Sequence, residues 1–412
     1  MTSSPSYPSE LARYVEAHWP PGSPLGVTVD ELAEALHVAY HASLMSEEAR
    51  PTRFRLLLTP PERLPSEGQP NRGVLRLLFE RSRPLHPDEL RRLAPAVPFE
   101  TALIGAHLEN GELRIWGVAH SGPAWLAPTW GGRRVVPNWT YGPIIHVTGP
   151  GQLAVRCAGG LVGALERGEL LDTRLDVFES RWLPAMFARE REEVRATHAA
   201  GATSTVEPSL VGLVGQHLLR RAIQLVRGAR HGGMFLVLDA GAGALPRSLR
   251  PKYLFQRDEP TRRYRTLLFQ ILDAVIAAAD KPSVGWSDFA SSKSSELERL
   301  ENAVFELSRV FANLAAIDGA VVVDKRFGLL GFGVEVSAEL PTPEVVWRAL
   351  DAEGREVRED DVERVGTRHR AAYRFVHDHP GGLAIVISHD GGVTFVASQE
   401  GRVVTWEQSV SP

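Results

Sequence analysis

Residues 294–324 read SSELERLENAVFELSRVFANLAAIDGAVVVD and decide the fold class of the C-terminal half. An apolar residue recurs every three or four positions from Leu297 to Leu314, which predicts one buried stripe along a helix. Ser295 and Glu298 form an S-x-x-E pattern, and we expect this capping box to start the helix. The helix runs directly into the apolar run AVVV, which predicts a buried strand. A helix that leads straight into such a strand indicates an α/β fold.

The same alternation of helix and strand continues through the rest of the C-terminal half. Helical periodicity covers 209–229 and about 261–279, and the segments MFLVLD, LAIVIS, VTFVAS and RVVTWEQ are typical of buried strands. The last three strands are separated by the turns HDGG and QEGR, which predict antiparallel hairpins. We therefore expect an α/β domain whose mixed central sheet is flanked by helices.

The first half of the chain has a different pattern of expected secondary structure. Residues 1 to about 50 are mainly helical in pattern, and 100–170 consist of short apolar strands punctuated by turns such as ENGE and GPGQ. After a helical stretch over 176–198, the segment ATHAAGATSTVEP loses apolar periodicity and gains Ala, Gly, Ser and Thr. This change predicts a boundary near residue 205. We expect a smaller α+β domain over 1–204 and the α/β domain over 205–412.

The bulk composition narrows the class of protein. The chain has 412 residues, a net charge of −4 and 43% hydrophobic residues. An acidic chain without a basic stripe is a poor candidate for nucleic-acid binding. Its single cysteine, Cys157, excludes an intramolecular disulfide, and no apolar run approaches the ~20 residues needed to cross a bilayer. The sequence predicts a cytoplasmic protein that does not enter the membrane.

Two short motifs could carry chemistry, and the first is DGA at 318–320. Asp318 stands where the apolar helix meets the apolar strand, and Gly319 and Ala320 follow it. One interpretation is a turn aspartate that satisfies nearby amides. The other is a carboxylate at a strand edge, with two small residues that let a ligand approach the backbone. The motif alone favours the first interpretation.

The second motif is GTRHRAA at 366–372. We expect Thr367 to be the N-cap of a helix whose first turn holds Arg368, His369 and Arg370. Cationic side chains are disfavoured at this end of a helix, because its amides already carry partial positive charge. A bound phosphate would explain the cluster, since it accepts hydrogen bonds from guanidinium groups and helix amides alike. A basic surface turn paired with the upstream segment REDDVE is the alternative.

The order and spacing of these two motifs resemble the diadenylate cyclase (DAC) domain family. DGA followed about 50 residues later by GTRHRAA, and then by LAIVIS and VTFVAS, is similar to that domain over 300–408. The resemblance extends more weakly to about residue 205 through RHGGMFLVLD and LRPKYLF. The front half, with YHASLMSEEARPTRFRLLL, resembles the DACNV-type region that precedes some such cyclases. That likeness implies a sensor whose signal the sequence does not reveal.

The resemblance implies a role for each matched residue of DGA. Asp318 would be the catalytic acid group, which helps to bind metal and activates a ribose 3′-hydroxyl. Gly319 and Ala320 would contact the nucleotide through their backbone. Val336, at the end of GFGVEV, would lie against adenine, and Ser388 would lie near the nucleotide at a strand end.

It also assigns the residues of GTRHRAA. Arg368 and Arg370 would hold phosphates, and His369 would contact phosphate or metal. Gly366 and Thr367 would lie against the same phosphates. The implied substrate is ATP, and the implied cofactor is Mg²⁺ or Mn²⁺.

One position departs from the family pattern. Many members follow the serine with two acidic residues, one of which binds metal, whereas this chain reads SHDGG at 388–392. Asp390 would replace that carboxylate, or His389 would bind metal instead. Because of this departure, the sequence does not determine which metal is preferred. A second possibility is a module that binds the nucleotide but does not turn it over.

The implied reaction joins two ATP molecules into cyclic di-AMP and releases two pyrophosphates. One chain carries one DGA and one RHR, so it can hold one ATP in a complete site. Ring closure needs two nucleotides that face each other. We therefore expect a face-to-face homo-oligomer to be required for catalysis.

Overall fold

The computed structural model describes residues 7–47, 50–64, 74–121, 131–133, 142–157, 160–166, 168–171, 175–199, 204–239, 245–256, 258–362 and 365–408. Contacts divide the chain into two compact units. The first is built mainly from Met1–Thr129 and Arg134–Thr173, and the second from Trp130–Arg133 and Arg174–Val410. In the part of the chain described, every helix is too short or too polar to cross a bilayer.

The first unit is one mixed sheet with helices on one face. The eight strands of this sheet run in the order β10-β9-β8-β7-β3-β5-β6-β4, and β1 and β2 pair separately. Alternate residues of the central strand β3 face opposite sides: Leu56 packs with helices α1 and α2, whereas Leu57 packs with Trp116 on the other face. The elements are α1 (Pro8–Ala17), α2 (Val29–Ser43), β1 (Ser46–Glu47), β2 (Arg50–Pro51), β3 (Phe54–Leu58), η1 (Pro61–Arg63), β4 (Leu75–Pro84), α3 (Pro87–Leu93), η2 (Ala94–Ala96), β5 (Ala102–Glu109), β6 (Glu112–His120), β7 (Ile144–Gly149), β8 (Gln152–Cys157), β9 (Gly160–Glu166) and β10 (Glu169–Leu171).

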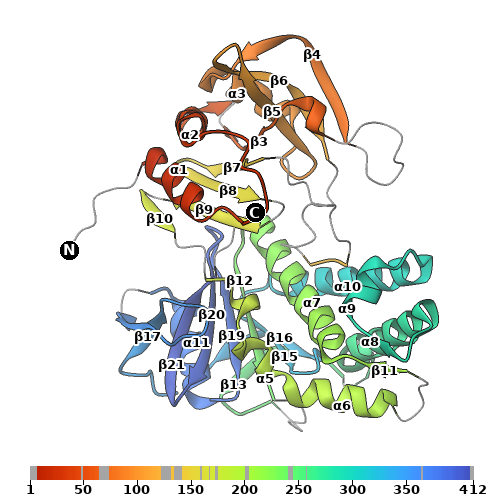
Figure 1. Ribbon diagram of the computed structural model, residues 1–412. Helices are drawn as coiled ribbons and strands as arrows, with labels where there is room; N and C mark the ends of the chain where they lie inside the picture. The colour runs from red at the N-terminus through yellow and green to blue at the C-terminus, as the bar shows by residue number, and fades with distance from the viewer. Residues whose placement is uncertain are drawn as a thin grey trace. The chain divides into compact units, whose positions relative to one another are not determined.

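The second unit is built around a nine-stranded mixed sheet with the order β13-β16-β15-β12-β19-β20-β21-β17-β18. This confirms the mixed sheet flanked by helices that the sequence predicts (Figure 1). The elements are η4 (Val177–Glu179), α5 (Trp182–Met186), α6 (Ala188–Ala199), β11 (Thr205–Val206), α7 (Pro208–Ala229), β12 (Gly233–Leu238), β13 (Leu249–Leu254), α8 (Glu259–Ala279), β14 (Ser283–Val284), α9 (Trp286–Ser291), α10 (Ser295–Leu314), β15 (Ala320–Asp324), β16 (Leu329–Val336), β17 (Val346–Ala349), β18 (Val357–Asp360), α11 (Thr367–Asp378), β19 (Leu383–Ile387), β20 (Val393–Gln399) and β21 (Arg402–Glu407).

Helices cover both faces of this sheet. On one face, Phe235 and Val237 of β12 share a core with α7, α8 and α10. On the other face, Leu236 of the same strand packs in a core with Tyr373 and Phe375 of α11. Because β12 is buried on both sides, its sequence is apolar throughout instead of alternating.

Helix α10 confirms the predicted stripe but begins with a different cap. Five residues of the stripe are buried, and Leu314 packs partly buried against the same core. The N-cap is Ser294, whose hydroxyl accepts from the Leu297 amide at 3.5 Å, so the expected capping box of Ser295 and Glu298 is wrong. The Ser294 amide in turn donates to the Ser292 hydroxyl at 3.2 Å. This bond holds the backbone just before the helix, so that Ser294, one residue before Ser295, is the cap.

The division by contacts falls after Thr173, before the boundary near residue 205 that composition indicates. The reason is packing: Leu183 of α5 and Val194 of α6 belong to the same apolar core as α7. The second unit therefore begins about 30 residues before the stretch that lacks apolar periodicity.

Candidate functional site

The topology of the second unit brings both motifs to one edge of its sheet. Strands β12 and β15 are parallel, and β16 and β19 run antiparallel to them. The start of β15, just after Asp318, therefore lies at the same edge as the end of β16 at Val336. The end of β19 reaches that edge too, since Ile387 pairs with Gly233 at the start of β12.

At this edge Asp318 offers an unpartnered carboxylate. The residue is exposed, and its carboxylate makes no hydrogen bond or ion pair with any other described residue. Its backbone carbonyl accepts from Lys252 Nζ at 3.3 Å. A turn aspartate that satisfied nearby amides would show those bonds. The geometry thus favours the interpretation of Asp318 as a carboxylate presented to a ligand.

Gly319 allows the backbone to take this path. Its φ of +114° lies in a region that other residues rarely adopt. A Cβ at this position would stand 2.5 Å from the carbonyl carbon of Gly333 in β16. Any side chain here would push β15 away from β16. Ala320 and Val336 at the same edge are buried in the apolar core on the α11 face.

Helix α11 begins at the same edge, although its N-cap differs from the expected one. Thr367 is the first helical residue, so its expected role as N-cap is wrong, and Gly366 takes that position with extended backbone. The first helical bond runs from the Arg370 amide to the Gly366 carbonyl at 3.2 Å. Gly366 has no side-chain oxygen to offer the first-turn amides. Both residues are exposed, so these amides are accessible to an anion.

Arg368 and His369 extend from the first turn of α11 over the ends of three strands. A Cβ on Gly232, just before β12, would stand 2.7 Å from Arg368 Nη1, which places this guanidinium at the start of β12. No hydrogen bond or ion pair to another described residue holds it. His369 Nε2 lies 3.1 Å from the hydroxyl of Thr394 in β20. Arg368 therefore lies at the start of β12, and Asp318 lies just before the start of the neighbouring strand β15. Neighbouring strands in a sheet are about 4.8 Å apart.

Arg370 points elsewhere. Its Nη1 donates to the Val365 carbonyl at 2.9 Å, which braces the loop before α11. The structure thus gives this arginine a local contact that its neighbour Arg368 lacks. Its contact with phosphate stays a prediction that depends on its remaining N–H groups.

The SHDGG loop closes the same edge between β19 and β20. The Ser388 amide donates to the Gly392 carbonyl at 2.8 Å. Nε of Arg227 in α7 donates to the Gly391 carbonyl, also at 2.8 Å, and so holds the loop against α7. His389 and Asp390 are exposed.

The donor set fits a metal ion that arrives with a nucleotide. Among the residues that the structure describes, no group of three or more histidine, cysteine, aspartate or glutamate side chains is placed to hold a metal. Mg²⁺ is commonly held by one or two carboxylates together with substrate phosphates and water. The free carboxylate of Asp318 fits that role, whereas Asp390 follows β19, two strands away from β15. His369 fits less well, because its Nε2 already contacts Thr394.

Burial sets the protonation state of His369. Desolvation lowers the pKa of this imidazole, and the negative charges of Glu407, Asp390 and Asp360 raise it in part. His369 is therefore neutral at pH 7, so of the three basic side chains in the motif only the two arginines carry positive charge there.

If this edge binds the phosphates of ATP, the neutral state of His369 makes that binding depend on pH. If phosphate oxygens approach His369, they favour its charged form and raise its pKa, so that binding takes up a proton. We expect the ATP affinity of the wild type to rise severalfold relative to His369→Gln as the pH falls from 7.5 to 6. Isothermal titration at both pH values measures this, and the variant controls for protonation of ATP itself. Equal pH dependence in the two proteins would remove His369 from the phosphate site.

A short segment from the front half, which stands in no recognisable motif, belongs to the second unit. Arg133 is 4% exposed and forms an ion pair with Glu301 of α10, with Nε 2.9 Å from Oε2. The neighbouring Gly132 amide donates to His217 Nδ1 of α7 at 2.9 Å. Burial lowers the pKa of His217 to about 3, so it stays neutral and remains an acceptor. We call 131–133 the strap.

Comparison with known families bears on the front half. Residues 24–120 match the family model described as "Probable sensor domain DACNV". This confirms the DACNV-type resemblance for those residues, and domains of this kind typically precede diadenylate cyclase domains. A cyclase domain is not detected by the same comparison, and no curated protein matches the chain. The chain thus carries a region that matches a sensor-domain model, followed by a mixed α/β unit with an anion-accessible sheet edge.

Proposed function

We propose that the second unit is a diadenylate cyclase whose output is tuned by the sensor region before it. The observation that carries this proposal is the meeting of an unpartnered carboxylate, Asp318, and an unpartnered guanidinium, Arg368, at one edge of one sheet. A substrate such as a nucleoside triphosphate would use both charges: the carboxylate can activate a hydroxyl, and the guanidinium can hold phosphates. The DACNV match over 24–120 supports the same pairing of domains.

In this proposal one ATP lies along the edge. Arg368 and the first-turn amides of α11 hold the phosphates, and Asp318 orients the ribose 3′-hydroxyl and accepts its proton. Each 3′-oxygen forms a bond to the α-phosphorus of the other ATP, and each α-phosphorus loses pyrophosphate. A bound Mg²⁺ or Mn²⁺ would supply neutralisation of the phosphate charge. Gly319 and Ala320 let the nucleotide approach the backbone, and Val336 and Ser388 border it.

The reaction needs two copies of this edge. Each chain provides one Asp318 and one Arg368, and each nucleotide is attacked by the hydroxyl of the other. Two chains that meet edge to edge with two-fold symmetry would place both hydroxyls in line with both leaving groups.

Dilution tests the need for two chains. We expect the rate of cyclic di-AMP formation per chain to fall roughly in proportion to protein concentration below the dissociation constant of the pair, because single chains hold only one ATP. Mass photometry gives the fraction paired, and product is measured at the same concentrations. A constant rate per chain across the range in which pairs dissociate would contradict the arrangement.

The alternative is a module that binds ATP without turnover. The SHDGG sequence, which departs from the two acidic residues of the resembled family, favours this alternative. Incubation of the full-length chain with ATP and Mn²⁺ or Mg²⁺, followed by mass spectrometry, separates the two. Cyclic di-AMP with two pyrophosphates per product supports the cyclase, whereas saturable ATP binding without product supports the module.

A further inference from the structure

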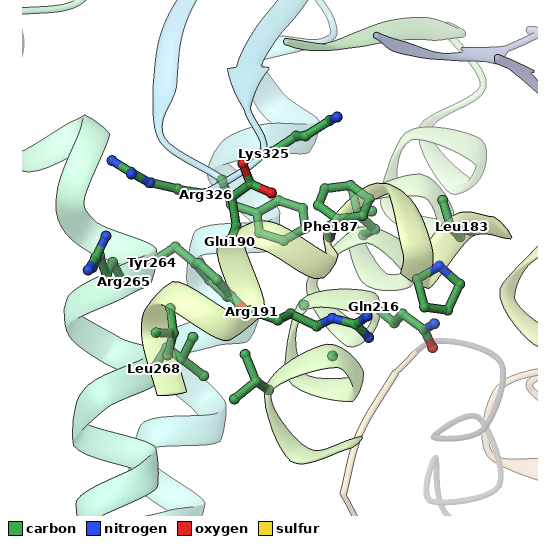
Figure 2. A pocket seen from close by; sticks show the side chains of 17 residues that line it. Leu183, Phe187, Glu190, Arg191, Gln216, Tyr264, Arg265, Leu268, Lys325 and Arg326 are labelled. Carbon is green, nitrogen blue, oxygen red and sulfur yellow. The ribbon is translucent and has the colours of Figure 1, made fainter. Parts of the chain in front are cut away.

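A cavity lies in the second unit at the opposite edge of the sheet. It is lined by the β15–β16 turn at 325–327 and by α5, α6, α7 and α8 (Figure 2). Asp318 precedes β15 and Lys325 follows it, so the strand separates this cavity from the edge that carries Asp318 and Arg368. The cavity holds about 640 Å³ not occupied by protein atoms, part of which is open to solvent.

The walls of the cavity are largely apolar and aromatic. Phe187, between α5 and α6, stacks on Phe327 with ring centroids 5.5 Å apart, and Tyr264 of α8 meets Phe327 edge-on at 4.9 Å. Leu183, Val211 and Leu268 complete the apolar lining. Aromatic rings in these arrangements offer flat surfaces to an apolar ligand of similar width.

The cavity lining includes two hydrogen-bond donors, Arg191 and Tyr264, and a buried carboxylate, Glu190. Arg191 of α6 lies over α7, where Gly212 makes room: a Cβ there would stand 3.1 Å from Arg191 Nη1. The Nε of Arg191 is buried and has no hydrogen-bond partner. Figure 2 shows its guanidinium extending toward Gln216. The hydroxyl of Tyr264 also makes no hydrogen bond to another described residue, although the side chain is buried.

The other cations that line the cavity are already neutralised. Arg265 and Arg326 both pair with Glu193, at 2.9 and 2.5 Å, and Lys325 pairs with Asp239 at 2.6 Å. The carboxylate of Glu190 faces the 325–327 turn and not Arg191 (Figure 2). Within the described part of the chain, Arg191 is thus the lining cation without an ion pair. Because the one other unpaired charge among the described lining residues, Glu190, lies beside the 325–327 turn, Arg191 is a single local cation that suits one carboxylate and not a triphosphate.

We propose that this cavity binds a small apolar carboxylic acid, whose carboxylate pairs with Arg191 and whose apolar part lies against Phe187 and Phe327. The site is independent of the proposed catalysis. A ligand here could regulate the second unit directly. The 325–327 turn lines the cavity and follows β15, and β15 begins just after Asp318.

Isothermal titration of the full-length chain with 2-naphthoate tests this site, with 2-naphthamide as the neutral probe of equal shape. We expect one saturable naphthoate site per chain and affinity at least about tenfold higher for the acid than for the amide, because a charge-assisted pair is lost. Arg191→Met should remove that preference and leave amide binding within about twofold. Arg189→Met, an exposed arginine on the same helix outside the cavity, should change neither.

Three results would overturn the proposal: no saturable naphthoate binding, equal affinity for acid and amide, or an acid preference that Arg191→Met leaves intact. The comparison of acid with amide in the wild type needs no variant to fold. Neither measurement depends on turnover of ATP, so failure here and failure of the cyclase proposal are distinguishable.

Discussion

Asp318→Asn is expected to lower the rate of cyclic di-AMP formation by at least about a hundredfold, while ATP affinity changes by less than about threefold. A positioned general base contributes about 10²–10⁴ to a rate, and asparagine keeps the shape of the side chain without accepting the 3′-hydroxyl proton. The side chain is exposed and makes no bond to another described residue, so the fold should not change. Initial rates from mass detection of product, together with titration of ATP, measure both quantities.

Glu335→Gln is the matched control for this variant. Glu335 is exposed at the end of β16, close to the same edge, and pairs with Lys252 at 3.5 Å. It removes one negative charge from the neighbourhood without touching the DGA motif, so the rate should stay within a few-fold of the wild type. If Asp318→Asn cyclises ATP as fast as this control, the role given to Asp318 is wrong.

The second large effect concerns stability. Arg133→Ala is expected to lower the free energy of unfolding of the second unit by about 2–3 kcal/mol, because Glu301, 12% exposed, loses the paired guanidinium and keeps the backbone amide of residue 133 as a donor. Arg133 also donates from Nη1 to the carbonyls of Ser292 at 2.6 Å and Phe289 at 3.3 Å, which would lose their donor. Hydrogen exchange of α10 amides in increasing urea measures the change.

Arg299→Ala provides the control for Arg133. This arginine lies on α10 and pairs with Glu296 at 2.8 Å, but its side chain is 76% exposed, so its loss should cost less than about 0.5 kcal/mol. A double variant, Arg133→Met with Glu301→Leu, should recover most of the stability, because no buried charge is left unpaired. An Arg133→Ala protein as stable as the Arg299→Ala protein would contradict the structural role of the strap.

These effects also bear on how the chain can be divided. A fragment over 205–412 lacks the strap, α5 and α6, and so leaves Glu301 and His217 without their partners. We expect such a fragment to be less stable than the second unit in the full chain. Low activity of that fragment would therefore not by itself show that the front half activates the proposed cyclase.

Part of the fold could be predicted from local sequence. The stripe of α10 and the apolar strand after it are unambiguous because both are buried on long, regular elements. The sequence does not determine where the helices start. Two adjacent serines can each cap α10, and Gly366 or Thr367 can each precede α11, so the choice depends on neighbouring bonds that the pattern does not contain.

The candidate site could be predicted only in part, and for a topological reason. The resemblance pairs DGA with GTRHRAA, but their meeting at one edge follows from the parallel and antiparallel order of four strands, which no local pattern fixes. The strap and the cavity at Arg191 depend on contacts between distant segments. Arg133 and Glu301 are 168 residues apart, and neither stands in a recognisable motif.

A crystal structure of the full chain with 3′-deoxy-ATP would test the central claim most directly, because this nucleotide lacks the attacking hydroxyl and stays bound. We predict one nucleotide per chain at the edge formed by β12, β15 and β19, with its triphosphate on Arg368 and the first-turn amides of α11, and its ribose C3′ beside the Asp318 carboxylate. A triphosphate bound away from Arg368, or a ribose that leaves Asp318 facing only solvent, would contradict the shared site.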